Sequence, residues 1–149
     1  MVRFKNRWII AEIIFPDSPP FEDSPNTEKR LDGKQILQSI RRNIAHNFGD
    51  HGAGSVANSL SLKYHSAITR LCIFRIAREY KDMLHAALTL TTSLSEYDVC
   101  IRVLHVSGTI RKVQEAAIRY NREAILNTSS DTQEEDLDTS KNDIMAIEN

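Results

Sequence analysis

Residues 104–122 read LHVSGTIRKVQEAAIRYNR, and they pass from a strand pattern into a helix pattern through Ser107, Gly108 and Thr109. At about 100° per residue, the helix that begins at Thr109 gathers four cations within a sector of about 100°, namely Arg111, Lys112, Arg119 and Arg122. The first N–H groups of a helix have no partner inside it, so the small-residue turn suits an anion. The stretch therefore predicts a helix with one core face and one cationic face, and a polyanion as its partner.

The rest of the chain also alternates between strand and helix patterns. Alternation of apolar and polar residues predicts a half-buried strand, whereas apolar residues at every third or fourth position predict a helix. The expected strands are Val2–Phe15, Val56–Tyr64, Ile68–Ile76 and Tyr97–Val106, and the expected helices are Gly33–Phe48, Glu79–Leu94 and Thr109–Leu126. The order β-α-β-β-α-β-α predicts an α/β (α+β) sandwich of the ferredoxin-like or RNA-recognition-motif-like type, with an extra C-terminal helix.

Charge divides the chain into two parts. The sequence has a net charge of −1, but residues 127–149 carry seven acidic residues and one lysine, which leaves 18 Lys/Arg and 13 Asp/Glu in residues 1–126. The expected organisation is a domain of residues 1–126, with a proline-rich loop at residues 16–30, followed by an acidic, disordered tail at 127–149. A basic domain of net charge +5 suggests contact with a nucleic acid, although an ordinary mixed-charge surface gives the same count.

The cellular setting is expected to be intracellular. Cys72 and Cys100 both lie in apolar strand patterns, which favours buried, reduced thiols over a disulfide framework. The N-terminal residues lack the apolar segment of a secretory signal, and no run approaches the 18 apolar residues of a membrane span.

The first strand places three cations on one side, namely Arg3, Lys5 and Arg7. The strand at residues 70–77, RLCIFRIA, lacks the aromatic pattern with which RNA-recognition motifs stack unpaired bases. Any RNA contact is therefore expected to rely on phosphates and on the shape of folded RNA. The alternative is that the three cations are merely the solvated face of an edge strand.

The Ser107-Gly108-Thr109 turn has two compatible interpretations. Ser107 or Thr109 is expected to cap the following helix while Gly108 supplies the bend. The same N–H groups, with Arg111 and Lys112, are also expected to hold an RNA phosphate. An acyl-phosphate hydrolase with Arg111 as its phosphate ligand is a further alternative, which would need Asn6 or Asn58 to position a water.

The folded region offers no catalytic constellation. The five histidines lie in different elements or straddle Gly49, and no carboxylate or cysteine cluster completes a metal site. His105 shares strand parity with Ile101 and Val103, so it is expected to be a histidine at the edge of the core rather than a ligand.

Two segments resemble a known family. The opening residues 1–8, MVRFKNRW, and the stretch LHVSGTIR at 104–111 with YNR at 120–122 closely resemble Pop-five-type small protein subunits of nuclear ribonuclease P and RNase MRP. The resemblance is colinear from Met1 to about Leu126. It departs at Trp8, where the family has Tyr, and at Ser107, where it has Gly. A Ser at 107 requires that this position have no positive φ.

The resemblance implies a non-catalytic, RNA-binding subunit of ribonuclease P and RNase MRP. In such particles the RNA performs 5′-leader removal from precursor tRNA and processes precursor rRNA, with Mg²⁺ bound by the RNA and no cofactor bound by the protein. Implied partners are ribonuclease P RNA, RNase MRP RNA, precursor tRNA, a TIM-barrel-like protein subunit and a second small subunit. The implied location is the nucleus and nucleolus. A generic α/β RNA-binding or protein-interaction module outside this complex is the alternative.

Overall fold

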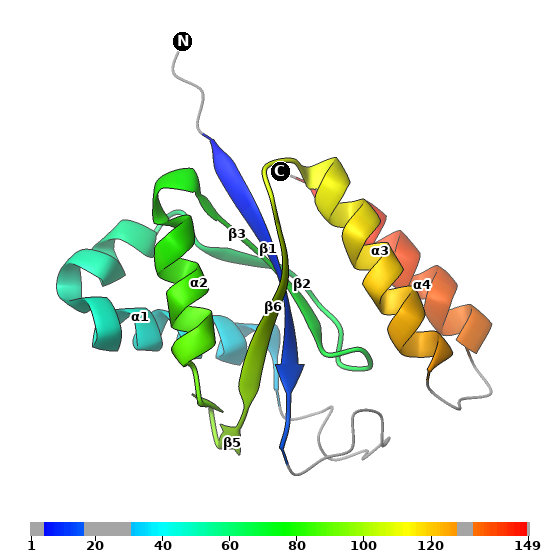
Figure 1. Cartoon of the computed structure of the whole chain (residues 1–149), viewed down its shortest axis with the longest axis horizontal. Coiled ribbons are helices and arrows are strands. Elements are labelled where there is room, and N and C mark those ends of the chain that lie inside the picture. Colours follow the sequence, from blue (N-terminus) through cyan, green and yellow to red (C-terminus); the bar gives the residue numbers. More distant parts are fainter. Residues whose placement is uncertain (1–4, 17–30, 128–132, 149) are drawn as a thin grey trace.

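The computed structural model describes residues 5–16, 31–127 and 133–148, and its elements are coloured along the chain in Figure 1. Four strands form the main sheet: β1 (Asn6–Ile14), β2 (Ser61–His65), β3 (Leu71–Ala77) and β6 (Cys100–Ser107). The helices are α1 (Gly33–Val56), α2 (Lys81–Leu90), α3 (Ile110–Leu126) and α4 (Gln133–Met145), with a single 3₁₀ turn, η1, at Arg78–Tyr80.

The sheet confirms the predicted fold class. Its strand order is β2-β3-β1-β6, and every neighbouring pair is antiparallel. Helices α1 and α2 cover one face, while α3 and α4 cover the other (Figure 1). This is the ferredoxin-like arrangement with an added layer, because two connections of the β-α-β type place β1 between β3 and β6.

The central strand β1 is buried on both faces. Ile9, Ala11 and Ile13 point into the core beneath α1 and α2. Trp8 and Ile10 point into a second core beneath α3 and α4. Alternation along a strand sends neighbouring side chains to opposite faces, so a continuous apolar run is what a strand between two helical layers needs.

Helix α1 continues further than its sequence pattern predicts. It runs to Val56, with a kink at Gly49, whose φ of 66° is left-handed. The prediction that a strand begins at Val56 is wrong: β2 begins at Ser61, and Val56 is a buried helical residue. Glycine accepts a positive φ without strain, so the chain bends there and resumes the helix.

The second helix is shorter than expected. Helix α2 ends at Leu90, and the next residues form a small ribbon in which β4 (Ser93–Leu94) pairs with β5 (Tyr97–Asp98). The prediction of a helix to Leu94 is therefore wrong. The two successive strands expected after the first helix are present, and they pair antiparallel as β2 and β3.

The acidic segment is not disordered over residues 133–148. Helix α4 packs along α3, and it buries Ile144 completely while Ile147, just beyond its end, is 8% exposed. The Gln114 side chain donates to the backbone oxygens of Ile144, Met145 and Ile147, at 3.2, 3.3 and 3.1 Å. The disordered tail is thus a wrong prediction for this part, and the packed unit extends well beyond residue 126.

Strand β6 contains a bulge that reverses its side-chain alternation. Ile10 pairs with His105 but Ala11 pairs with Val103, so Leu104 is the extra residue. The expectation that His105 shares a face with Ile101 and Val103 is therefore wrong, because a bulge sends the residues after it to the opposite face.

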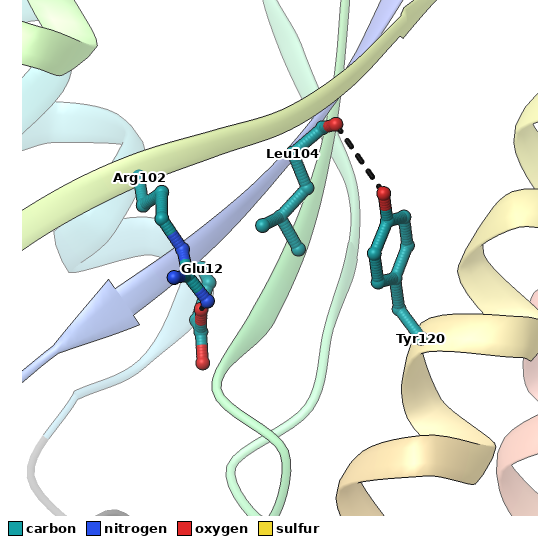
Figure 2. Close-up of polar contacts among 4 residues, drawn as sticks. All are labelled: Glu12, Arg102, Leu104 and Tyr120. Carbon is teal, nitrogen blue, oxygen red and sulfur yellow. Dashed lines mark hydrogen bonds and ion pairs between the residues drawn. The ribbon is translucent and has the colours of Figure 1, made fainter.

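Tyr120 of α3 donates a hydrogen bond to the Leu104 backbone oxygen at 3.4 Å (Figure 2). Beside this contact, Arg102 of β6 and Glu12 of β1 form a cross-strand ion pair at 2.5 Å. The close-up shows that both interactions lie on the side of the sheet that faces α3. The third helix is therefore fixed to the sheet at the bulge itself.

Candidate nucleic-acid interface

The first candidate site lies at the end of the sheet where β1 begins, β6 ends and α3 starts, at the top of Figure 1. Pairing of Trp8 with Ser107 sets this arrangement, because it brings the residue before Trp8 next to the residue after Ser107. We call Arg7, Ser107, Gly108 and Thr109 the turn site. Two predicted sets of residues, far apart in the sequence, meet here.

Arg7 lies directly over Gly108. A Cβ atom built on Gly108 would lie 3.2 Å from Arg7 Nη1 and 3.5 Å from its Cζ. The chain bends at Gly108, as predicted, although the positive φ among the described glycines belongs to Gly49. The missing side chain of Gly108 also makes room for the guanidinium group, which donates to the Asn6 backbone oxygen at 3.0 Å.

Ser107, rather than Thr109, organises the turn. The Thr109 N–H donates to Ser107 Oγ at 3.3 Å, and that hydroxyl also lies 3.3 Å from the Thr109 carbonyl oxygen. Thr109 occupies the N-cap position in extended conformation, but its side chain makes no capping hydrogen bond. Ser107 has no positive φ, which agrees with the expectation for a serine in place of glycine at this position.

The four predicted cations of α3 are exposed but do not act alike. Arg111 pairs with Glu115 one helical turn away, with a 3.2 Å separation of Nε and Oε1. Arg119 lies 5.3 Å from the ring centroid of Tyr120. Glu115 and Glu123 lie on the same solvent-facing side as the cations. The predicted cationic face is therefore a face of mixed charge, since the sequence interpretation counted the basic residues and omitted the acidic ones.

The predicted residues do not all converge. Lys112 lies in the first turn of α3, close to the turn site, whereas Arg119 and Arg122 lie about 10–15 Å beyond Lys112 along the helix, at about 1.5 Å per residue. Lys5 is exposed just before β1, and Arg3 lies outside the described residues. Arg111 and Lys112 are thus the α3 cations next to the turn site, whereas Arg119 and Arg122 form a separate group further along the helix.

The YNR sequence at 120–122 is mainly structural. Tyr120 holds the bulge carbonyl, and Asn121, which is 2% exposed, connects three elements. Its Oδ1 accepts from Thr69 Oγ1 at 2.6 Å, and its Nδ2 donates to Tyr64 Oη at 3.0 Å and to Ser140 Oγ at 2.5 Å. Sequence reasoning did not assign Asn121 a role, although a polar residue on the apolar side of a helix is a usable signal.

Other chemistry is weakly represented in the described part of the chain. No group of three or more His, Cys, Asp or Glu residues is placed there to hold a metal ion. The same part contains no helix with the length and apolar character to cross a bilayer. Cys72 is buried, and burial raises the pKa of its thiol, whereas Cys100 is exposed, contrary to the expectation of two buried thiols.

The fold and the turn site define a ferredoxin-like α/β domain with a second helical layer and a basic sheet end. The chain belongs to the Rpp14/Pop5 family, whose family model matches residues 7–118. It is 40% identical over 131 residues to the ribonuclease P/MRP protein subunit POP5 of Schizosaccharomyces pombe, covering 87% of this chain and 94% of that one. It is 33% identical to the probable POP5 subunit of Arabidopsis thaliana, over all of both chains.

The human relative, also named ribonuclease P/MRP protein subunit POP5, is 31% identical over 130 residues, which cover 85% of this chain and 76% of that one. Among solved structures, a chain from the cryo-EM structure of yeast ribonuclease MRP matches with a TM-score of 0.50 and 13% identity, over 99% of each chain. At that identity the match supports the fold. Family membership rests on the sequence relatives and on the family model.

Proposed function

We propose that this chain is a protein subunit of ribonuclease P and RNase MRP that binds RNA and leaves the chemistry to the RNA component. The observation that carries the proposal is colinear similarity to named subunits of these particles over nearly the whole chain. The turn site supports it, because Arg7 is held over an open helix N-terminus in an arrangement suited to a phosphate.

The role proposed for the chain follows from its charge and chemistry. Cations at the sheet end reduce repulsion between RNA phosphates and fix their geometry, which helps the RNA to hold a precursor tRNA or precursor rRNA. Mg²⁺ would be bound by the RNA and supply the attacking water there. The proposed partners are the two RNAs, the precursor tRNA, a TIM-barrel-like subunit and a second small subunit, in the nucleus and nucleolus.

For RNA binding, Arg7 of the turn site is expected to matter more than Arg111 of α3. Arg111 is already paired with Glu115, and its side chain is 87% exposed, so it offers a less positioned donor. Removing Arg7 should weaken assembly with RNA by about 1.5–3 kcal/mol, the range for a hydrogen bond to a charged group. Arg7→Lys should recover part of this loss, since lysine keeps the charge but not the planar fork.

The test is co-purification with a tagged full-length chain from cells. Wild type should enrich two large structured RNAs together with companion protein subunits, and Arg7→Ala should enrich less of both RNAs. Arg42→Ala is the matched control, because Arg42 is an exposed cation on α1 away from the turn site. Enrichment of unrelated RNAs alone would favour the generic module.

A second measurement concerns catalysis. Purified chain, freed of RNA, is incubated with precursor tRNA under single-turnover conditions, and no cleavage is expected. If the RNA-free chain cleaves precursor tRNA, and a folded Arg7→Ala variant does not, the proposal that the RNA component is the catalyst is overturned.

The acyl-phosphate hydrolase alternative gains no support from the geometry. Asn6 and Asn58 line a cleft at the end of the sheet, whereas Arg111 is not among the residues that line it. The phosphate ligand and the water-positioning amide of that hypothesis therefore do not meet.

A further inference from the structure

A cleft of about 900 Å³ opens at the same end of the sheet, on the opposite side of β1 from the turn site. We call it the sheet-end cleft, and the lining residues that matter for the argument are Lys5, Asn6, Asn58, Arg75, Arg78 and Tyr80. The volume lies within the range of clefts that hold drug-sized ligands. None of the sequence patterns singled out this cleft.

Three parts of the chain build the cleft walls. The helical segment after the Gly49 kink brings residues 54–59 to the end of β3, and the 3₁₀ turn that begins at Arg78 closes the other side. The Arg78 N–H donates to the Lys5 backbone oxygen at 2.9 Å, which holds the two cationic residues next to each other. The kink at Gly49 is thus a requirement of the cleft.

The charges in the cleft favour an anion. Lys5, Arg75 and Arg78 line it against the single carboxylate of Glu79. Among the described residues, the buried side-chain polar atoms without a hydrogen-bond partner are Arg75 Nε and Ser61 Oγ, and these residues face each other across strands β2 and β3. Both atoms are covered by protein and Ser61 is not among the residues that line the cleft, so this pair adds nothing to the anion site, which rests on the three cations.

The other cleft groups narrow the class of anion. Asn6 and Asn58 offer both donors and acceptors, which suit the edges of a base, and Tyr80 offers a ring beside the cations. The turn site lies on the other flank of β1, since Arg7 follows Lys5 by two residues. A polynucleotide strand that crosses this end of the sheet would meet both groups of cations in succession.

We infer that the sheet-end cleft binds an unpaired nucleotide of RNA, with flanking phosphates on Lys5 and Arg78. This inference rests on the proposed function and specifies a second RNA contact for it. An acidic protein segment would also satisfy the cations, but it would not use the two amides and the ring.

The first test measures binding of the full chain to a fluorescein-labelled single-stranded RNA oligonucleotide and to ribonuclease P RNA at several salt concentrations. Lys5→Gln/Arg78→Gln should lower the slope of log affinity against log salt for the oligonucleotide by about 1.4, at about 0.7 per lost phosphate contact. The control is Lys34→Gln/Arg42→Gln, which removes two exposed cations outside the cleft, and its slope should match wild type.

The second test adds charge instead of removing it. Gly54 lines the cleft, and a Cβ atom there would meet nothing within 4 Å, so a longer side chain fits. Gly54→Glu and Gly54→Gln have the same size and differ in charge. Gly54→Glu should bind the oligonucleotide about fivefold more weakly than Gly54→Gln, the effect of one like charge about 4 Å away in water.

Three outcomes would overturn the inference. A slope equal to that of the control, or equal affinities of the two Gly54 variants, would show that RNA does not enter the cleft. Cleft variants that keep RNA binding but lose companion proteins on co-purification would assign the cleft to a protein. A wild-type chain that ignores the single-stranded probe yet still enriches ribonuclease P RNA would remove the nucleotide site and leave the proposed function standing.

Discussion

Asn121 is the residue at which the second helical layer is most sensitive to a single substitution. Its amide makes three hydrogen bonds, to Thr69, Tyr64 and Ser140, and so joins the β2–β3 hairpin to α3 and α4. Asn121→Ala removes all three and leaves the Thr69 hydroxyl, in a residue only 5% exposed, without its acceptor. At about 0.5–1.5 kcal/mol for each hydrogen bond, the expected loss in the free energy of unfolding is about 2–4 kcal/mol.

The assay is urea unfolding followed by far-ultraviolet circular dichroism. Ser140→Ala alone should cost about 1 kcal/mol, and the double variant should show a coupling energy of about 1 kcal/mol, because the two substitutions remove one shared hydrogen bond. Asn47→Ala is the control, since Asn47 is exposed and should change stability by at most about 0.5 kcal/mol. A loss below about 0.5 kcal/mol in Asn121→Ala, or additive losses in the double variant, would refute the role given to this amide.

Three further predictions concern other residues. Ser107→Ala should lower the free energy of unfolding by about 1 kcal/mol and Thr109→Ala by less than about 0.5 kcal/mol, because the Ser107 hydroxyl makes the hydrogen bonds of the turn. Urea unfolding in which Thr109→Ala costs more than Ser107→Ala would contradict this. A thiol reagent should modify Cys100 quickly in the folded chain and Cys72 only after denaturation, since Cys72 is buried with a raised pKa; rapid modification of both would argue against that burial. Burial, partly opposed by Asp32, lowers the pKa of His65 below 6.5, so the unfolded chain takes up the proton at a higher pH than the folded chain does. Stability should therefore fall as the pH drops below about 6.5, until the pH passes the folded-state pKa. In thermal unfolding at several pH values, His65→Gln should flatten this decline.

The fold class follows from the order of elements, and the sequence carries that order clearly. The apolar run after Arg7 predicts a strand whose far end lies in the core, and Ile36, Ile40 and Ile44 predict the first helix. The ends of elements were less predictable. Gly49 usually ends a helix, yet here it bends one, because Val56 beyond it still reaches the core.

Acidic composition misled the interpretation of the last segment. Ile144 and Ile147 lie in a polar stretch whose other large apolar residues are Leu137 and Met145, too weak a pattern for a clear periodic signal. Their burial depends on Gln114 and Asn121, which lie on another helix, and no local pattern records such a contact. For the candidate site, the sequence named Arg7 and the turn separately. Arg7 lies next to the turn because Trp8 pairs with Ser107, and this strand register could not be predicted from the sequence.

The bulge at Leu104 also limits where the chain tolerates insertions and deletions. Ile101 and Val103 before it, and Val106 after it, pack against the same core although their spacing changes from even to odd. Loss of Leu104 itself would restore a regular strand, but it would also remove the carbonyl that Tyr120 binds and a side chain that packs against the second core. Loss of any one residue between Ile101 and Val106 removes the extra residue and leaves both of these side chains on the core face, whereas loss of a second residue there would turn half of β6 over. A one-residue difference in length among relatives is therefore expected within this segment rather than elsewhere in β6.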